Sequence, residues 1–567
     1  MTSSPVAKQN HLDLPQEIWW VVMQELSART DHHSLFLCSK VSRGFATLAL
    51  PLLYSISEHS KASASSAGSE VVSENLRSSV VFWRSVISSA IGKTRFPYCT
   101  WIKTLKLSDL LCLLEDIGRD AAMRAKFFSS PLEGFEVLNP RRRQGLDFDQ
   151  IIATAAEKVT ERIRASADAE DRVAGLLNLE GPHLPTTQLS AWLARLPMLT
   201  SLSVRDGSVL TAAVGEAIKG GCPGFKELTC YYCRGTGADD AMAGFFNALR
   251  PNALESFTVN SLNDLRDRCF TALGSHAQSL RCLELESLEQ LGLESVHLIG
   301  PCPKLKRLTL EADSVVYRGS RWTNLDEAVV WLQQCPSLEE FSSIKIPLVQ
   351  PFLERAIEAG NFQLKRLRVF GPCDEGLFSA LEIHQKKIQS LILHTTMEDI
   401  DEEDALDTDK HQALFNLMLS LGSNLNHLVV DEPITYDEFQ ALFYGMFNIE
   451  ILVINPYPFH DSYFQHLASL PKLKFLAITS QTDITFEQMT WFLDRLEGTE
   501  YNDNGIELPP PDHKQIAIQL NNQEYGSSFT EEEYEELQER LKSRWGGWLT
   551  VNYMGDPDEL HESDFSD

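Results

Sequence analysis

Hydrophobic residues recur along the chain as a phrase of three positions, the second three residues after the first and the third two residues later. In the segment CPKLKRLTLEAD, residues 302–313, these positions are Leu305, Leu308 and Leu310, with polar residues around them. Leu308 and Leu310 are two residues apart, which is the period of a β-strand, so they face one side and Thr309 faces the other. The phrase therefore predicts a short strand that is buried on one face.

The phrase returns at nearly regular intervals. Eleven copies begin at Leu199, Phe225, Leu254, Leu280, Leu305, Leu338, Leu364, Ile388, Leu425, Ile449 and Leu473. Eight of the ten intervals between them lie between 24 and 29 residues, and the other two require only insertions in loops. Prolines such as Pro303 and Pro336 stand just before a strand, where they end the preceding helix without removing a ladder hydrogen bond. This spacing is typical of leucine-rich repeats and predicts an α/β solenoid, or horseshoe.

Composition narrows the class of protein. The 567 residues are 43% hydrophobic and 23% charged, with 79 acidic against 50 basic residues and a formal net charge of −29. Nucleic-acid binding requires a basic surface, so it is disfavoured. No apolar run reaches the length of about 20 residues that a membrane helix needs, and residues 1–15 lack an apolar signal core. Eleven cysteines in so long a chain suggest buried thiols in a reducing compartment, so we expect a cytoplasmic and/or nuclear protein.

Residues 11–56 predict a small helical unit. Two apolar stripes at helical spacing run through it, the first being Leu14, Ile18, Val22 and Leu26 and the second Leu37, Val41, Phe45 and Leu48. A segment this short cannot bury both stripes by itself. Three stretches carry a resemblance to the F-box family: Leu-Pro-Gln-Glu-Ile at 14–18, Leu35 followed by Cys38 and Val-Ser-Arg-Gly-Phe at 41–45, and Pro-Leu-Leu-Tyr at 51–54.

The resemblance implies specific partners. An F-box binds a Skp-family linker and, through it, a cullin scaffold, and the whole chain is similar to fungal-type F-box/leucine-rich-repeat proteins, the substrate receptors of SCF ubiquitin ligases. Linker binding would then fall to Leu14, Pro15, Ile18, Leu26 and Val41. The alternative interpretation of residues 11–56 is a plain helical cap that protects the first repeat.

The remaining chain divides by composition. We expect a disordered tail at 1–10, the F-box at 11–56, a Ser/Ala-rich flexible linker at 57–75, and the solenoid at 76–500. Insertions at 108–172, which includes an arginine triplet, and at 397–410, which is acidic, interrupt the solenoid. Residues 501–567 predict a C-terminal extension with one helix, which a capping box at Thr530 and Glu533 begins, and an acidic tail.

A substrate surface is predicted where solvent-facing strand positions turn apolar. In four successive repeats these positions are Ile392, Val429, Val453 and Ala477, whereas those of earlier repeats are mostly polar. Neighbouring strands lie about 4.8 Å apart, so the four side chains form a stripe on the concave face. The adjoining positions form a polar edge of His394, Asp431, Asn455 and Thr479. Alternatively, the helix at 530–544 folds back and covers the stripe.

Motifs for chemistry are weak or missing. Cys230 and Cys233 have a zinc-like spacing, but no second pair follows, and Cys230 is at an inward strand position. Gly92-Lys93-Thr94 lacks the first glycine of a phosphate loop, and the acidic tract at 397–410 lacks the spacing of a calcium loop. We therefore expect a non-catalytic adaptor without cofactor or metal, in which the repeats hold a substrate protein. A leucine-rich-repeat scaffold outside any cullin ligase and an unrecognised enzyme remain alternatives.

Overall fold

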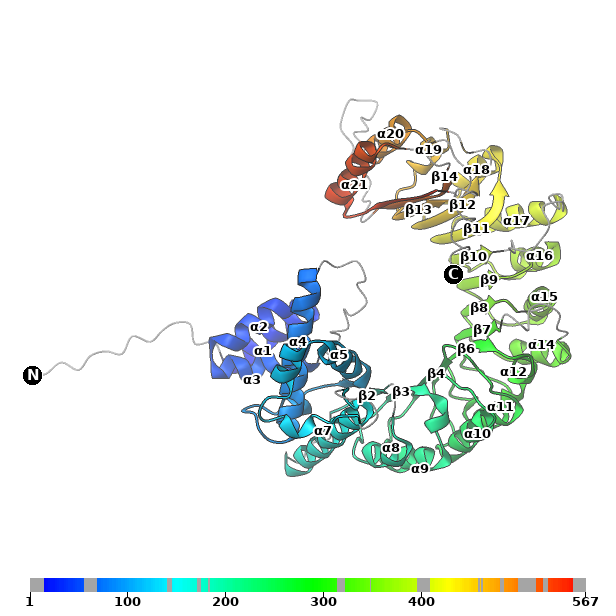
Figure 1. The fold of residues 1–567 in the computed structure, drawn as a ribbon. Coiled ribbons are helices and arrows are strands. Elements are labelled where there is room, and N and C mark those ends of the chain that lie inside the picture. The colour runs from blue at the N-terminus through cyan, green and yellow to red at the C-terminus, as the bar shows by residue number, and fades with distance from the viewer. Residues whose placement is uncertain are drawn as a thin grey trace, which may run out of the picture. The chain divides into compact units, whose positions relative to one another are not determined.

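The structure is a computed structural model in which the chain divides into two compact units, Met1–His276 and Ala277–Asp567. It describes residues 15–55, 69–139, 145–170, 175–181, 184–313, 322–346, 348–394, 408–456, 459, 462–479, 484–497, 516–523 and 529–553. In each unit, parallel strands alternate with helices, and the repeat helices lie on one face of the sheet (Figure 1). The chain is a leucine-rich-repeat solenoid preceded by a small all-α segment.

The first unit begins with three helices, α1 (Gln16–Ala28), α2 (His32–Val41) and α3 (Arg43–Ser55). Asp31 begins α2 by accepting a hydrogen bond from the backbone N–H of Ser34 at 3.0 Å. The centre of this helical segment consists of Met23, Leu35, Leu48 and Ala49, with Trp19, Trp20, Leu26, Cys38, Phe45, Leu52 and Leu53 packed around them. A core of this size leaves much of the apolar surface of α1 and α2 uncovered.

Tyr54, near the end of α3, attaches these helices to the repeats. Its ring lies 5.4 Å from that of Phe82 in α4 (Ser69–Ala90) and 4.7 Å from that of Tyr98 in η1 (Tyr98–Thr100), and Trp101 completes the cluster. Burial raises the pKa of Tyr54 to about 12. The helical segment is therefore packed directly against the start of the solenoid. The prediction of a flexible linker at 57–75 is wrong for residues 69–75, because they form the first turns of α4. Residues 56–68 lie outside the described part of the chain.

The sheet of the first unit follows chain order, and its strands are β1 (Thr104–Lys106), β2 (Asn178–Gly181), β3 (Ser201–Asp206), β4 (Glu227–Tyr232) and β5 (Ser256–Val259). The insertion expected at 108–172 consists of helices between β1 and β2: α5 (Leu107–Arg119), α6 (Ala121–Phe127), η2 (Glu133–Phe135) and α7 (Phe148–Glu170). The repeat helices are α8 (Thr186–Ala194), η3 (Gly207–Val209), α9 (Ala212–Gly221), α10 (Ala238–Ala248), α11 (Asp267–Leu273) and η4 (Gly274–His276). The arginine triplet, residues 141–143, lies outside the described residues.

The second unit continues the same plan. Its strands are β6 (Cys282–Leu288), β7 (Arg307–Ala312), β8 (Glu340–Ile344), β9 (Arg366–Phe370), β10 (Ser390–His394), β11 (His427–Ile434), β12 (Ile451–Pro456), β13 (Phe475–Ile478), β14 (Ala517–Gln523) and β15 (Leu549–Tyr553). Its helices are α12 (Gln290–Ser295), η5 (Val296–Ile299), α14 (Leu325–Gln333), α15 (Val349–Ala359), α16 (Glu375–His384), α17 (Thr408–Leu421), α18 (Tyr436–Phe443), α19 (Ser462–Leu467), α20 (Phe486–Glu497) and α21 (Glu531–Trp545). All the pairings between neighbouring strands are parallel.

The eleven predicted phrases coincide with the core of the solenoid. Their first apolar positions, in the turns before the strands, and their strand positions are all buried, and none is more than 2% exposed. Leu308, for example, pairs in register with Leu283 on one side and with Phe341 on the other. The three-position phrase therefore supplies one continuous apolar layer beneath the helices of each unit.

The C-terminal boundary of the solenoid differs from the prediction. Residues 517–523 and 549–553 form β14 and β15, so the repeats continue beyond residue 500. Ile516, Ile518 and Leu520 alternate at the period of a strand and are fully buried, which explains β14. The acidic residues 554–567 and the tract 395–407 lie outside the described residues. None of the described helices has both the length and the apolar content that a bilayer crossing requires.

Candidate protein-interaction surfaces

The first candidate surface is formed by apolar side chains of α1 and α2. Six large ones are between 39% and 68% exposed, and they are Ile18, Val21, Val22, Phe36, Leu37 and Val41. Val21 and Val22 follow Ile18 by three and four residues, so both lie on the same face of α1 as Ile18. The ammonium of Lys40 lies 3.9 Å above the ring of Phe36 and adds one positive charge to α2. Six such side chains in a 41-residue described segment are an unusual exposure, and exposed apolar patches often mark partner-binding surfaces.

The five residues predicted to bind the linker do not share one environment in the structure. Ile18 and Val41 are exposed on α1 and α2, and the exposed Pro15 is the residue immediately before α1. Leu26, in contrast, packs against the helical core, so its side chain is engaged within the helical segment and is not free for a linker. Leu14 lies outside the described residues. Val21 and Phe36 were missed, although the spacing of residues 18, 21 and 22 is itself a helical signal.

The second candidate surface is the open face of the second unit, defined here as the sheet face opposite the helices. Strand register places the predicted stripe in one row: Ile392 pairs with Val429, Val429 with Val453, and Val453 with Ala477. The row continues to Gln519 and then Thr550 in β14 and β15, and in the other direction to Arg368. The predicted alignment of the four apolar side chains is therefore present in the structure.

The exposure of the row is less uniform than the sequence suggests. Val429 is only 8% exposed and Ala477 only 3%, whereas Ile392 and Val453 are half-buried. Val429 lies in register between Ile392 and Val453, which flank its side chain on both sides. Only Ile392 and Val453 thus offer substantial apolar surface within this row.

Aromatic and polar groups border the row. His394 Nδ1 lies 3.9 Å from Asp431 Oδ2, and the Asn455 side-chain amide donates to the backbone carbonyl of Asp431 at 2.9 Å. Thr479 donates to the carbonyl of Ile454 at 3.0 Å. Three residues of the predicted polar edge, His394, Asp431 and Asn455, lie on successive strands and are linked through Asp431, and Thr479 directly follows the next strand. Their hydrogen bonds also brace the strands against one another.

At the other end of the open face acidic and basic side chains lie side by side, since Arg307 pairs with Glu284 at 3.6 Å and with Glu340 at 2.9 Å. Glu284, Glu286 and Glu311 lie on β6 and β7, and the proximity of Glu311 and Glu284, together with burial as the larger cause, raises the pKa of Glu286. Burial likewise raises the pKa of Glu311, against the opposing influence of Lys345 and Arg368. The open face thus changes from charged to apolar along the repeat order.

The predicted fold-back of the C-terminal helix does not occur. Helix α21 lies between β14 and β15 in sequence, and β15 pairs parallel with β14, so α21 takes the ordinary helix position of a repeat. Arg540 on α21 pairs with Asp494 on α20 at 2.6 Å, which places the two helices side by side. Among the described residues, α21 therefore does not cover the apolar row.

Cys230 and Cys233 are both buried, and the adjacent Cys233 thiol, followed by burial, raises the pKa of the Cys230 thiol. Within the described residues, no cluster of three or more His, Cys, Asp or Glu side chains has a metal-binding arrangement.

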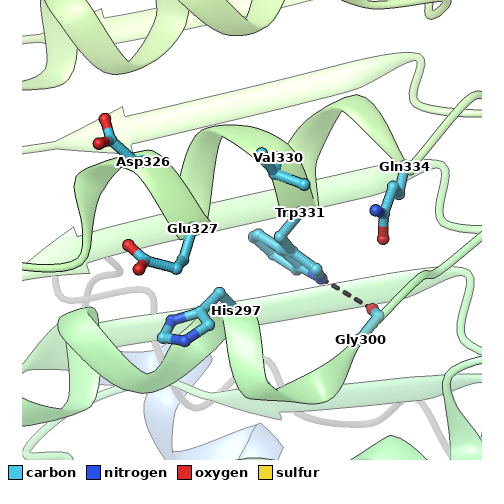
Figure 2. Close-up of a pocket in the computed structure, with 7 residues that line it drawn as sticks. All are labelled: His297, Gly300, Asp326, Glu327, Val330, Trp331 and Gln334. Carbon is cyan, nitrogen blue, oxygen red and sulfur yellow. Dashed lines mark hydrogen bonds between the residues drawn. The ribbon is translucent and has the colours of Figure 1, made fainter.

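A hollow of about 450 Å³ lies on the helical side of the second unit, between η5 and α14 (Figure 2). Several of its polar groups are already engaged: Trp331 donates to the carbonyl of Gly300 at 3.0 Å, and Asp326 pairs with Arg355 at 2.8 Å. His297 contacts the carbonyl of Glu294 through Nδ1 at 2.8 Å. The hollow thus contains no nucleophile paired with a base, and we assign it no chemistry.

Comparisons with known proteins add little to this geometry. No protein-family model matches the chain, and no curated protein matches it. Among solved structures, an internalin (inlF) of Listeria monocytogenes aligns with 70% of this chain and 95% of its own at 11% identity, with a TM-score of 0.31. The yeast Rad7–Elc1 complex aligns with 57% of this chain and 88% of its own at 11% identity, with a TM-score of 0.30. The TLR13–ssRNA13 complex aligns with 70% of this chain and 63% of its own at 15% identity, with a TM-score of 0.29. Scores this low carry no argument, so the repeat assignment rests on the chain's own strand register and core.

Proposed function

We propose that this chain is a non-catalytic substrate receptor of an SCF-type ubiquitin ligase. In this proposal α1–α3 form an F-box that binds a Skp-family linker, the linker attaches a cullin scaffold, and the repeats hold a substrate protein. The observation that carries it is the set of exposed apolar side chains on α1 and α2, which includes Ile18 and Val41 from the F-box-like motifs. The chain would contribute proximity, and a separate enzyme would transfer ubiquitin.

The attachment of the helical segment supports this role. A receptor has to hold its substrate at a fixed distance from the ligase, so its linker-binding helices and its repeats need a firm connection. The aromatic cluster of Tyr54, Phe82, Tyr98 and Trp101 supplies such a connection at the start of the solenoid. Clusters of this kind contribute beyond simple burial, at about 0.5–1.5 kcal/mol for each ring pair.

Co-purification with a recombinant Skp-family linker tests the proposal. The full-length double variant Ile18→Asp/Val41→Asp should lose at least about tenfold in linker affinity, because interface anchors typically contribute more than about 1.4 kcal/mol each. Val81→Asp is the matched control, since Val81 on α4 is 56% exposed and lies outside the surface. Unchanged linker binding by the double variant would refute the F-box assignment. Recovery of the linker without a cullin would instead favour a scaffold outside the ligase.

A further inference from the structure

A second apolar patch lies in the second unit, away from the open face. Four large side chains near the C-terminal ends of successive helices are strongly exposed: Ile383 at 65%, Leu419 at 43%, Tyr444 at 76% and Phe447 at 52%. Ile383 belongs to α16 and Leu419 to α17, whereas Tyr444 and Phe447 follow the end of α18 (Figure 1). We call these four residues the lateral patch.

Strand register places the residues of the lateral patch at equivalent positions of successive repeats. Ser390 pairs with His427 and His427 with Ile451, so equivalent positions lie 37 and then 24 residues further along the chain. By this spacing Ile383, Leu419 and Tyr444 are equivalent to within one residue. The positions equivalent to them in the flanking repeats are Ala359 and Ala468, so the patch has defined ends.

Side-chain hydrogen bonds tie the turns beneath the patch together. Asn424 donates to the carbonyl of Lys386 at 2.9 Å, and Asn448 donates to the carbonyl of Ser423 at 2.9 Å. Lys472 then donates to Asn448 at 2.7 Å. The ends of α17 and α18 also approach closely, since a Cβ atom on Gly422 would lie 3.6 Å from the carbonyl carbon of Gly445. The apolar side chains thus stand on a braced, pre-formed edge, which lowers the entropy cost of binding.

The charge around the patch is opposite to that of the chain as a whole. The turn segments 383–389, 419–426, 443–449 and 467–474 contain four lysines, against two adjoining acidic residues, Glu382 and Glu450, although acidic residues outnumber basic ones by 79 to 50 in the chain. Lys474 pairs with Glu450 at 2.6 Å, whereas the exposed side chains of Lys386, Lys387 and Lys472 flank the patch. An acidic ligand is therefore attracted here, and a basic one is repelled.

We propose that the lateral patch docks an acidic, amphipathic segment of a partner protein. The aliphatic side chains Ile383 and Leu419 offer nothing to a phosphate backbone, so a peptide is favoured over a nucleic acid. Neighbouring packed helices are about 8–10 Å apart, so three successive helix ends span about 16–20 Å. A partner helix of about 12 residues, at about 1.5 Å per residue, covers that length. Tyr444 and Phe447 would be its main anchors, because exposed aromatics commonly dominate such interfaces. This binding depends neither on the linker surface nor on the open face.

A displayed library of random 14-residue peptides, selected on the immobilised full-length protein, tests the proposal. Enriched peptides should combine glutamate or aspartate with apolar residues at helical spacing. The variant Tyr444→Ser/Phe447→Ser should bind the best of them at least about tenfold more weakly. Tyr231→Ser is the matched control, since Tyr231 is 54% exposed on β4 of the first unit. The pair Lys386→Glu/Lys387→Glu should weaken acidic peptides and strengthen lysine-substituted versions of the same peptides.

The contrary results are distinct. The proposal fails if the library yields no enrichment, if basic peptides are enriched, or if the enriched peptides bind both double variants as tightly as the wild type. It also fails if the wild type is a dimer that Tyr444→Ser/Phe447→Ser dissociates in analytical ultracentrifugation, because the occupant is then a second copy. If Leu560→Ser/Phe565→Ser in the acidic segment 554–567 raises peptide affinity, the chain's own C-terminal segment is the occupant. Should Tyr444→Ser/Phe447→Ser unfold, Ile383→Ser/Leu419→Ser provides the same comparison.

Discussion

The ring of His394 on β10 stacks on that of Phe370 on β9, with ring centroids 4.2 Å apart and 28° between their planes. The guanidinium of Arg368 lies 4.6 Å from the centroid of the same Phe370 ring. One aromatic side chain thus holds a permanent cation and a titratable imidazole close together on the open face. Asp431 lies 3.9 Å from the imidazole on the next strand and favours its protonation.

These neighbours predict the titration of His394. Burial is the largest influence and lowers its pKa, Asp431 opposes this, and Arg368 lowers it further. The imidazole is therefore neutral at pH 7, and folding disfavours its protonation. This contribution to stability is complete above the ordinary value of 6.5 and is lost as the pH falls below it.

Selective ¹³C-histidine labelling with NMR titration measures this pKa, with His394→Gln to assign the signal. Asp431→Asn should lower the pKa of His394 further, and Arg368→Gln should raise it. A pKa of His394 at or above that of a free histidine would contradict the role of burial.

The second prediction concerns the stability of variants in the apolar row, which contains one buried and one half-buried valine. Val429→Asp places a charge at a position that is 8% exposed, so it should cost about 2–3 kcal/mol of stability. Val453→Asp, in register on the next strand, should cost less than half as much because its side chain is half-buried.

Urea unfolding of the two full-length variants, followed by circular dichroism, provides the comparison. Equal destabilisation would mean that the open face around Val453 is covered. A substrate that binds this row should lose affinity for Val453→Asp even though the variant remains folded.

The repeat core was predictable because it depends on local periodicity. The three-position phrase places Leu308 and Leu310 on the buried face by chain geometry alone, and each copy fixes its own strand. The burial of Val429 was not predictable, since it depends on Ile392 and Val453, which are 37 and 24 residues distant in the chain. The same limit applies to Leu26. Its position in an apolar stripe of α1 does not reveal that it packs against the core that α1 forms with the other two helices.

The end of the solenoid was missed for a different reason. The proline run at 509–511 and the polar residues around it obscured the alternation of Ile516, Ile518 and Leu520. Leu549 and Val551 alternate in the same way in β15, but only two apolar residues mark that strand. Both alternating patterns are short, and pairing with the neighbouring strand decides that each segment forms a strand.

The eleven cysteines provide a third prediction. All are free thiols and eight are buried, whereas Cys112 on α5 is exposed and Cys38 and Cys282 are intermediate. Burial is the largest influence that raises the pKa of Cys112, and Glu115, Asp109 and Asp116 raise it further. Because the thiolate is the reactive form, Cys112 should react slowly at pH 7.5 despite its exposure, and its rate should rise as the pH approaches and passes 9.

Iodoacetamide labelling with peptide mass spectrometry measures this rate. Glu115→Gln should accelerate the reaction by removing one of the negative charges, and added salt should act in the same direction. Labelling of Cys112 at the rate of an unstructured cysteine peptide would contradict the prediction. After denaturation without reductant, all eleven thiols should be counted.

The last prediction concerns the terminal strand β15, whose backbone is partly satisfied by α21. Tyr534 donates its hydroxyl to the carbonyl of Leu549 at 2.9 Å, and the backbone N–H of Leu549 donates to the side chain of Gln538 at 2.6 Å. Two side chains one helical turn apart thus occupy both polar groups of one residue in the last described strand. Unpaired groups at such an edge template aggregation, so this arrangement protects the end of the sheet.

The double variant Tyr534→Phe/Gln538→Ala should remove both hydrogen bonds while leaving the buried Leu537 and Leu541 in place. Loss of two such bonds should cost about 1–3 kcal/mol, confined to the last repeat because each repeat contacts only its neighbours. Hydrogen exchange should therefore accelerate in β15 and β14 but not in β6 or β7, and the protein should aggregate sooner on heating. Tyr231→Phe is the control. Unchanged exchange at β15 would show that parallel pairing with β14 alone secures the strand.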